Sequence, residues 1–174
     1  MSKIDHQLVG LSIAASIWAL LAHLGYEYGV IALAAFAAIS GSTAPDWLEI
    51  AHAERDMRGG WQRVSVIPHR TFTHWVPLWI GALGVALCAL PLHPAVGHFG
   101  FSDSRAVWSA ILLGFACGGL SHLAADIPNP TGIPVILPTR QYRISLNWWR
   151  SGSGYEWMEI FAFWGCSALL VVAL

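Results

Sequence analysis

Charged side chains are scarce in this sequence. Asp, Glu, Lys and Arg make up 11% of the 174 residues, against roughly a quarter in an ordinary soluble domain. The nine basic residues form no patch with interleaved aromatic residues, and the net charge is −1. A nucleic-acid-binding surface is therefore not expected. Apolar residues make up 56% of the chain and there are ten tryptophans, which is typical of a membrane protein with interfacial anchors.

Cysteine motifs and the common hydrolase signatures are also missing. The three cysteines, Cys88, Cys117 and Cys166, lie inside apolar runs at no ligand spacing, which argues against a disulfide framework and a cysteine zinc site. The sequence contains neither His-Glu-x-x-His nor Gly-x-Ser-x-Gly, so a zincin protease and a serine esterase are not expected.

Five long stretches contain no charged residue: 7–26, 28–45, 71–102, 106–125 and 160–174. A helix needs about 20 apolar residues to cross a bilayer. We therefore predict an all-α fold, a polytopic membrane helix bundle that forms a single integral-membrane domain over residues 1–174, with about five transmembrane helices near residues 8–25, 28–45, 74–93, 106–126 and 156–174. The second and fifth stretches are short, so four spans with one re-entrant or interfacial segment is the alternative.

The basic residues predict the orientation of the bundle. With five spans, the segments 1–7, 46–73 and 127–155 share one side of the membrane. That side holds eight of the nine basic residues, all except Arg105: Lys3, Arg55, Arg58, Arg63, Arg70, Arg140, Arg143 and Arg150. Because positive residues favour the cytoplasmic side, we expect the amino terminus there.

The two longer segments on this side have different character. Residues 46–57 interleave apolar and charged side chains before Gly59 and Gly60, which predicts an amphipathic turn on the membrane surface. Residues 127–155 contain four prolines and are not expected to form a regular helix. They are apolar enough to dip into the interface and to cover a site there.

Potential metal ligands fall at the same end of every expected helix. His122 and Asp126 are four residues apart, hence on one face of a helix. Singly, each residue has a simpler explanation as a cap or an interfacial group, but together they predict a site for one or two divalent ions, zinc or a manganese-type metal. The predicted ligands are His6, Asp46, His69, His74, His122, Asp126 and Glu156. His23, His52, His93 and His98 lack this arrangement, and we expect none of them to bind metal.

The order of these motifs resembles the YdjM-type predicted inner-membrane metal-dependent hydrolases. The resemblance spans nearly the whole chain and rests on His6, Ser42–Asp46, His69–His74, Gly119–Asp126, Pro130–Pro138 and Glu156. It implies a multi-pass protein of the bacterial inner membrane with a cytoplasmic active site. The sequence departs from the family pattern at Trp47, Leu48, Thr71 and Trp75, and where the family has a second Asp it offers only Glu49, one turn from Asp46.

A weaker resemblance is to the zinc-dependent phospholipase C and P1 nuclease group, which suggests phosphoester cleavage by analogy. We therefore expect a hydrolase that acts on a lipid or lipid-linked substrate through a metal-activated water. Asp46 or Asp126 is the expected bridging ligand or general base. Arg70 is expected either to hold a phosphate oxygen or to anchor the chain at the interface. The alternative is a non-enzymatic protein, a metal-binding scaffold or a metal transporter.

Overall fold

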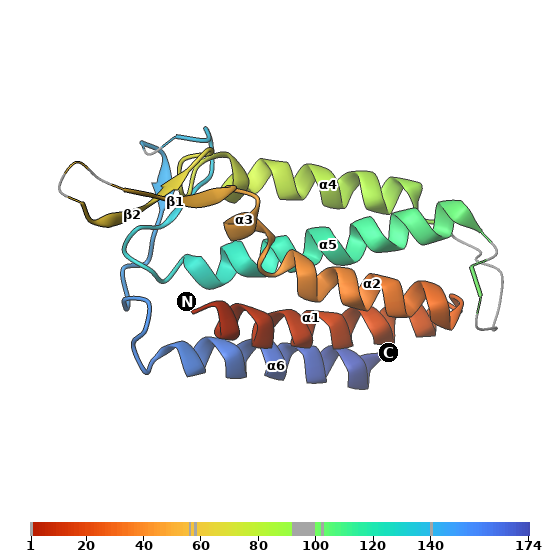
Figure 1. Cartoon of the computed structure of the whole chain (residues 1–174). Coiled ribbons are helices and arrows are strands. Elements are labelled where there is room, and N and C mark those ends of the chain that lie inside the picture. The colour runs from red at the N-terminus through yellow and green to blue at the C-terminus, as the bar shows by residue number, and fades with distance from the viewer. Residues whose placement is uncertain (1, 56, 58, 92–99, 102, 140) are drawn as a thin grey trace.

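The computed structural model describes residues 2–55, 57, 59–91, 100–101, 103–139 and 141–174. Five helices run alongside one another in a bundle (Figure 1). They are α1 (Lys3–His23), α2 (Tyr28–Gly41), α4 (Val76–Ala89), α5 (Ser104–Asp126) and α6 (Glu156–Ala173). A short α3 (Ala44–Trp47), a 3₁₀ turn η1 (Phe72–His74) and two small hairpins complete the described chain.

The helix boundaries follow local sequence signals. Helix α1 begins at Lys3, earlier than the expected residue 8, because Ser2 and Asp5 form a capping box at its start. The expected helix 28–45 is divided into α2 and α3, with Ser42 and Thr43 between them. Helix α4 ends at Ala89, and residues 92 and 93 of the expected helix lie outside the described part of the chain.

Three helices are long and apolar enough to cross a membrane: α1, α5 and α6. Helices α2 and α4 contain 14 residues each, about 21 Å of helix at 1.5 Å per residue, which is shorter than a hydrocarbon core of about 30 Å. The structure is therefore mostly helical, with three candidate spans among its described residues. The count of five spans stays a prediction.

Helix α5 packs closely against α2 through two glycines. A side chain at Gly114 would collide with the carbonyl oxygen of Ala34, and one at Gly118 with the carbonyl oxygen of Ala38. Small residues allow helix backbones to approach in this way. This contact brings the last turns of α5, which carry His122 and Asp126, beside the end of α2.

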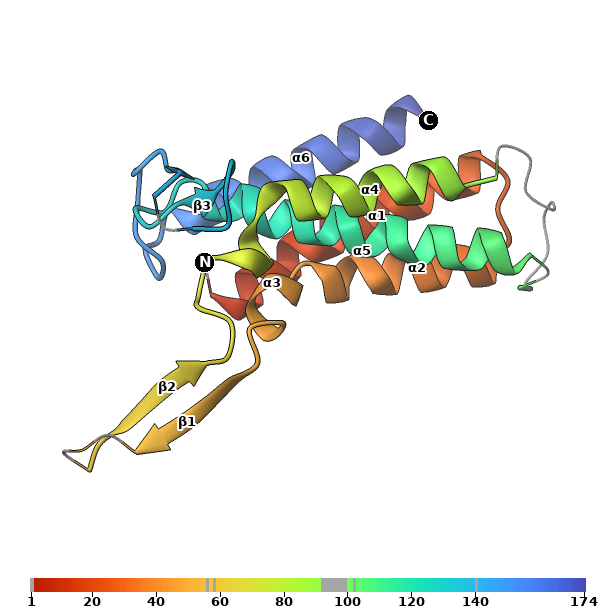
Figure 2. The same ribbon diagram turned by 90° about the horizontal axis from the view of Figure 1, so that it is seen from above.

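The expected amphipathic turn after Asp46 is wrong. Strands β1 (Ala51–Arg55) and β2 (Trp61–Ser65) pair antiparallel as a hairpin, in which Ala51 pairs with Ser65 and Arg55 with Trp61. The hairpin projects away from the bundle (Figure 2). Gly59 has a positive φ of 80°, which glycine adopts readily. Gly59 and Gly60, which the sequence suggests as a break, therefore lie between the two strands of the hairpin.

The segment between α5 and α6 contains no helix among its described residues. Its only regular structure there is the two-residue ladder of β3 (Ile133–Pro134) with β4 (Arg143–Ile144). The indole nitrogen of Trp75 donates to the carbonyl oxygen of Ile136 at 3.2 Å, which ties the segment to the start of α4. This segment lies at the same end of the bundle as the amino terminus (Figure 1).

Candidate metal centre

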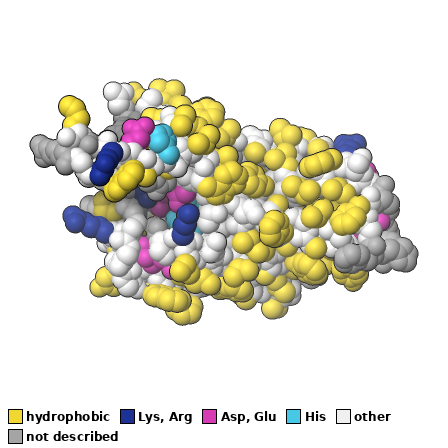
Figure 3. Space-filling view, in the orientation of Figure 1, with side chains coloured by type: hydrophobic (Ala, Val, Ile, Leu, Met, Phe, Trp, Pro, Cys, Tyr) yellow, Lys and Arg dark blue, Asp and Glu magenta, His cyan; other side chains and the backbone are white. Residues whose placement is uncertain are grey.

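Polar side chains gather at the end of the bundle where α1 begins and α5 ends (Figure 3). Six of the seven predicted ligands, together with Glu49, form three overlapping groups whose potential ligand atoms lie within 4.8 Å of one another. The groups are Asp46, Glu49, His69 and His74; His6, Asp46 and His122; and His74, His122 and Asp126. Because Asp46, His74 and His122 each belong to two groups, the residues form one continuous cluster, which we call the ligand cluster.

His74 and His122 lie at the centre of the ligand cluster. Both side chains are fully buried, and their Nε2 atoms are 3.3 Å apart. Asp126 Oδ2 lies 3.8 Å from Nε2 of His74 and 3.7 Å from Nε2 of His122. On the other side, Asp46 Oδ1 lies 3.6 Å and 3.9 Å from the same two nitrogens. The Nε2 atoms of the two imidazoles therefore meet beside two carboxylates.

Hydrogen bonds at Nδ1 fix which nitrogen of each ring is available. His122 Nδ1 lies 2.8 Å from the carbonyl oxygen of Ser42, and because a carbonyl only accepts, Nδ1 carries the proton. His74 Nδ1 lies 3.4 Å from Glu49 Oε1 and 3.1 Å from Thr73 Oγ1, and the carboxylate places a proton there too. The Nε2 atoms of the two rings lie 3.3 Å apart, close enough for one cation to bind both. The residues present therefore fit a divalent metal.

His6 extends the ligand cluster onto α1. Its ring stacks on that of His122, with centroids 3.8 Å apart and planes at 17°. Its Nε2 lies 3.9 Å from Asp126 Oδ1. His6 Nδ1 is buried and has no hydrogen-bond partner among the described residues. A buried nitrogen without a partner is costly, so this atom is a second feature that a bound cation or its water would satisfy.

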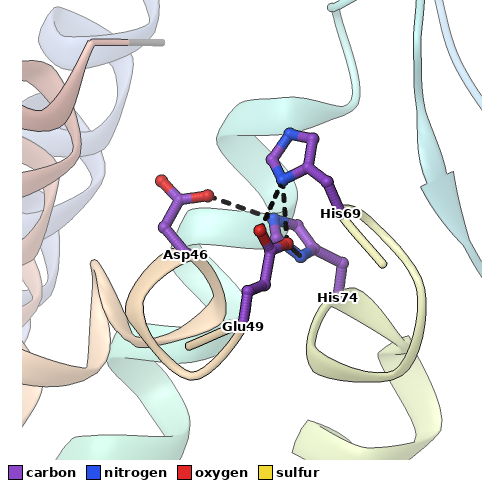
Figure 4. A group of neighbouring side chains, drawn as sticks. All are labelled: Asp46, Glu49, His69 and His74. Carbon is purple, nitrogen blue, oxygen red and sulfur yellow. Dashed lines mark hydrogen bonds and ion pairs between the residues drawn. The ribbon is translucent and has the colours of Figure 1, made fainter. Parts of the chain in front are cut away.

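Glu49 and His69 form the side of the ligand cluster beside η1 (Figure 4). Glu49 is fully buried, and both of its carboxylate oxygens lie 2.8 Å from His69 Nδ1. Its Oε1 also accepts from the backbone N–H of Arg70 at 3.1 Å. From the sequence, Glu49 is expected only as a substitute for the missing second Asp. Its spacing of three residues from Asp46, one helical turn, was the signal that could have placed it among the ligands.

Arg70 lies inside this end of the molecule and not at its surface. The residue is 7% exposed, and its Nη2 donates to Asp126 Oδ1 at 2.9 Å. Its Nη1 contacts Thr131 Oγ1, and its carbonyl oxygen accepts from Arg143 at 2.8 Å. Arg70 therefore holds one oxygen of Asp126, which leaves the other oxygen facing His74 and His122.

Glu156 lies outside the three groups. It is buried at the start of α6, where its Oε1 accepts the backbone N–H of Gly152 at 3.1 Å, and it lies beside Asp5. Helix α6 packs against α1 on the side away from α3 and η1 (Figure 1). The structure thus gives Glu156 a role in the turn before α6, and its role as a ligand stays a prediction.

Asp46 lies in α3, outside the membrane-spanning helices, and its environment favours the ionised form. Burial by itself would raise the pKa of this carboxyl group. The neighbouring His74 and His122 side chains oppose this effect of burial and hold the pKa well below its usual range. A carboxyl group must be deprotonated to bind a metal, so Asp46 has the protonation state that a ligand needs.

The remaining histidines lie elsewhere. His23 is exposed at the far end of α1. His52 is about half exposed on β1, with Nε2 2.8 Å from Glu54. His93 and His98 lie outside the described residues. Neither His23 nor His52 belongs to the three groups of potential ligands found among the described residues.

Comparison with known families agrees with the membrane character of the chain. The family model described as YdjM inner membrane protein matches residues 1–173. The chain belongs to the YdjM inner membrane protein family. The ligand cluster is thus a feature of a YdjM family member, at the end of its apolar bundle. No curated protein and no solved structure matches the chain, so the chemistry proposed for this site rests on its own geometry.

Proposed function

We propose that this YdjM family member is a membrane-embedded, metal-dependent hydrolase that cleaves a phosphoester of a lipid or lipid-linked substrate at the cytoplasmic face of the inner membrane. The observation that carries the proposal is the pair of buried Nε2 atoms of His74 and His122, 3.3 Å apart between Asp46 and Asp126. Ionisable groups of this kind are costly at the end of an apolar bundle and usually serve a function.

The donor set favours zinc. Imidazole nitrogen and carboxylate oxygen are common zinc ligands, and manganese accepts the same mixture. Three residues are shared between ligand groups, which suits two neighbouring ions with bridging ligands as well as one ion. A divalent ion held there would supply Lewis acidity, which lowers the pKa of a water molecule and polarises a phosphoryl oxygen.

The exposure of the ligands favours catalysis over a closed structural site. The side chains of His6, His74 and His122 are buried, whereas the side chain of Asp46 is 25% exposed and that of His69 is 53% exposed. One edge of the ligand cluster is therefore open to water and substrate. A structural zinc site is normally closed by four ligands, whereas a catalytic site keeps an open position.

The two candidate bases differ in how they are held. Asp126 is 2% exposed and its Oδ1 is bonded to Arg70, so it suits a fixed ligand. The side chain of Asp46 is 25% exposed at the open edge of the ligand cluster, so an approaching water can reach its carboxylate. We therefore assign the general base to Asp46 and the positioning of Asp126 to Arg70.

The charges suit an anionic substrate. If two divalent cations are bound, they outweigh the three carboxylates of Asp46, Glu49 and Asp126, and Arg70 adds to the positive surplus. A phosphoester oxygen is attracted to such a site. The Arg70 Nε atom is buried and without a partner among the described residues, and it is a donor that a phosphate oxygen could use.

Product analysis with a metal-dependence control tests this function. Purified protein would be incubated with mixed membrane lipids, with and without a chelator, and the lipids analysed by mass spectrometry. We expect a phosphoester cleavage product that disappears on chelation and in Asp46→Asn, but persists in His52→Ala, the control away from the ligand cluster.

The scaffold alternative makes the opposite prediction. A metal-stabilised scaffold would bind zinc and lose thermal stability on chelation, but would form no product from any lipid class. A transporter should carry ligands near the middle of the membrane, and in the part of the chain that the structure describes the ligand groups lie at one end. Bound metal without product would therefore favour the scaffold.

A further inference from the structure

A second feature of the bundle bears on the substrate, and it lies in the apolar part of the structure. Helices α1, α5 and α6 border a cavity of about 500 Å³. Its lining includes Ile13, Ile17 and Leu20 of α1 and Phe163, Cys166 and Leu170 of α6. A volume of this size is within the range of small-molecule and lipid sites. We call it the α1–α6 groove.

The α1–α6 groove offers no free polar group from its two serines. Ser16 Oγ donates to the backbone of Ser12 at 3.2 Å and lies 2.8 Å from Ser167 Oγ. Ser167 Oγ donates to the carbonyl oxygen of Ser12 at 2.8 Å. These hydroxyls are used between helices, so the groove presents an apolar wall. Its occupant must therefore be apolar, because a polar group there would lose its hydrogen bonds.

The groove and the ligand cluster lie along the same face of α1. Ile13, Ile17 and Leu20 follow His6 by seven, eleven and fourteen residues, spacings that return to one side of a helix. At 1.5 Å per residue the groove begins about 10 Å from His6 and ends about 21 Å from it. If the ligand cluster lies at the membrane face, the groove lies at the depth of the hydrocarbon core.

We propose that the α1–α6 groove holds the acyl chain of the substrate, so that the substrate is a lipid whose phosphorylated headgroup reaches the ligand cluster while its tail lies between α1 and α6. This inference rests on the proposed function and specifies its substrate class. A soluble phosphoester would meet the ligand cluster but leave the groove unused. A lipid fills both at once, since its polar and apolar parts are separated in the same direction along the bundle.

The groove would contribute more to the orientation of the lipid substrate than to its binding affinity. An acyl chain that enters it leaves a bilayer that is equally apolar, so little is gained from burial itself. Holding the tail against one face of α1 fixes the direction in which the headgroup projects, toward His6 and His122. Alignment of reacting groups accelerates reactions strongly. We therefore expect chain length to affect turnover more than binding.

Photolabelling tests the groove without requiring turnover. The probe is a single-chain lysophosphatidate with a diazirine in the tail, added to the metal-loaded protein in vesicles of neutral phospholipid and mapped by peptide mass spectrometry. We expect label on Phe163 and Cys166 and little on Val85, which is exposed on α4. Unlabelled lysophosphatidate should compete, glycerol phosphate should compete only at higher concentration because it meets the ligand cluster without filling the groove, and a probe that lacks the phosphate should label weakly.

A matched pair of variants locates the label. Ala162→Trp places an indole in the groove lining, and Ala168→Trp places the same side chain at an exposed position of α6 outside it. Labelling of the groove should fall at least about threefold in the first variant and stay unchanged in the second. Melting curves of both proteins identify a folding defect, and the wild-type label map stands independently of either variant.

Four results would overturn the groove inference. Equal labelling of the outer faces of α4 and α6 would mean ordinary bilayer lipid, and labelling independent of the phosphate would separate the groove from the ligand cluster. If native mass spectrometry finds a lipid-free dimer and the groove is not labelled, the groove is filled by a second copy of the chain. If the groove is labelled but no lipid is cleaved, the groove stands and the hydrolase proposal fails. If lipid is cleaved without groove label, only the groove inference fails.

Discussion

The two ends of the bundle both carry polar residues, but these residues are satisfied in different ways. At the far end, Tyr26 donates to the carbonyl oxygen of Pro91 at 2.5 Å, and Asp103 caps α5 through the backbone N–H of Arg105 at 2.8 Å. Arg105 Nε in turn donates to the carbonyl oxygen of Ala89 at 2.9 Å. These are ordinary helix-end interactions.

At the end that carries the ligand cluster, the same kinds of residue meet one another instead. His74 and His122 direct their Nε2 atoms at each other, and His6 Nδ1 is left without a partner among the described residues. Polar groups at helix ends normally find backbone partners, so the arrangement at this end is one that could hold a metal ion. The two ends therefore differ in how their polar side chains are arranged relative to one another. This arrangement, more than the presence of His and Asp, distinguishes a candidate metal centre from ordinary helix caps.

The largest expected difference is between two histidine substitutions, one at each end of the bundle. His122→Ala removes a central member of the ligand cluster and should lower the affinity for zinc by more than about 100-fold, because loss of even a supporting partner costs 10- to 100-fold. His23→Ala changes an exposed histidine at the far end of α1 and should leave zinc content unchanged. Elemental analysis of the purified proteins measures both. Equal zinc in the two variants would show that the cluster is not the metal centre.

A smaller difference in zinc affinity is expected between two arginine substitutions, one at each end of the bundle. Arg70→Lys keeps the charge but loses the fork that contacts Asp126 and Thr131, since lysine offers a single point of charge. Zinc affinity should fall about 10- to 100-fold, as measured by competition with a fluorescent chelator. Arg105→Lys is the control at the far end. If Arg70→Lys binds zinc as wild type does, Asp126 does not depend on Arg70 for its position.

The smallest effect is expected at the far end. Tyr26→Phe removes the hydrogen bond to Pro91 and should cost about 1 kcal/mol of stability, seen as a small decrease in the melting temperature. Zinc content should not change, because Tyr26 lies at the other end of α1 from His6. Loss of zinc in this variant would mean that the two ends are coupled, and would break the comparison.

The uncharged runs were sufficient to place the helices. Each of the five expected helices overlaps a helix in the structure, because runs of apolar residues leave a membrane chain few alternatives to helix. Their lengths were harder to predict. Ser42 and Thr43 separate α2 from α3, and no charge marks that division in the sequence. The hairpin at 51–65 was missed because its glycines break a helix and turn a hairpin equally well.

The residues of the candidate site likewise include some that spacing predicts and some that only packing can distinguish. His6, His74, His122 and Asp126 converge because each lies at a helix end, a position that spacing reveals. The spacing from Asp46 points to Glu49, but spacing gives no reason to set Glu156 aside, since Glu156 opens a helix at the same end of the bundle. What separates them is packing: Glu49 is turned toward His69 and His74, whereas Glu156 bonds the turn before α6.

The spread of the ligands along the chain has a consequence for biosynthesis. His6 lies on the first helix to be made, whereas Asp126 is the last member of the ligand cluster to leave the ribosome, 120 positions later. An ion held by the ligand cluster would therefore find its complete set of ligands only once α5 has been made. Metal loading should follow insertion, and since Glu156 stands outside the groups, it need not wait for α6.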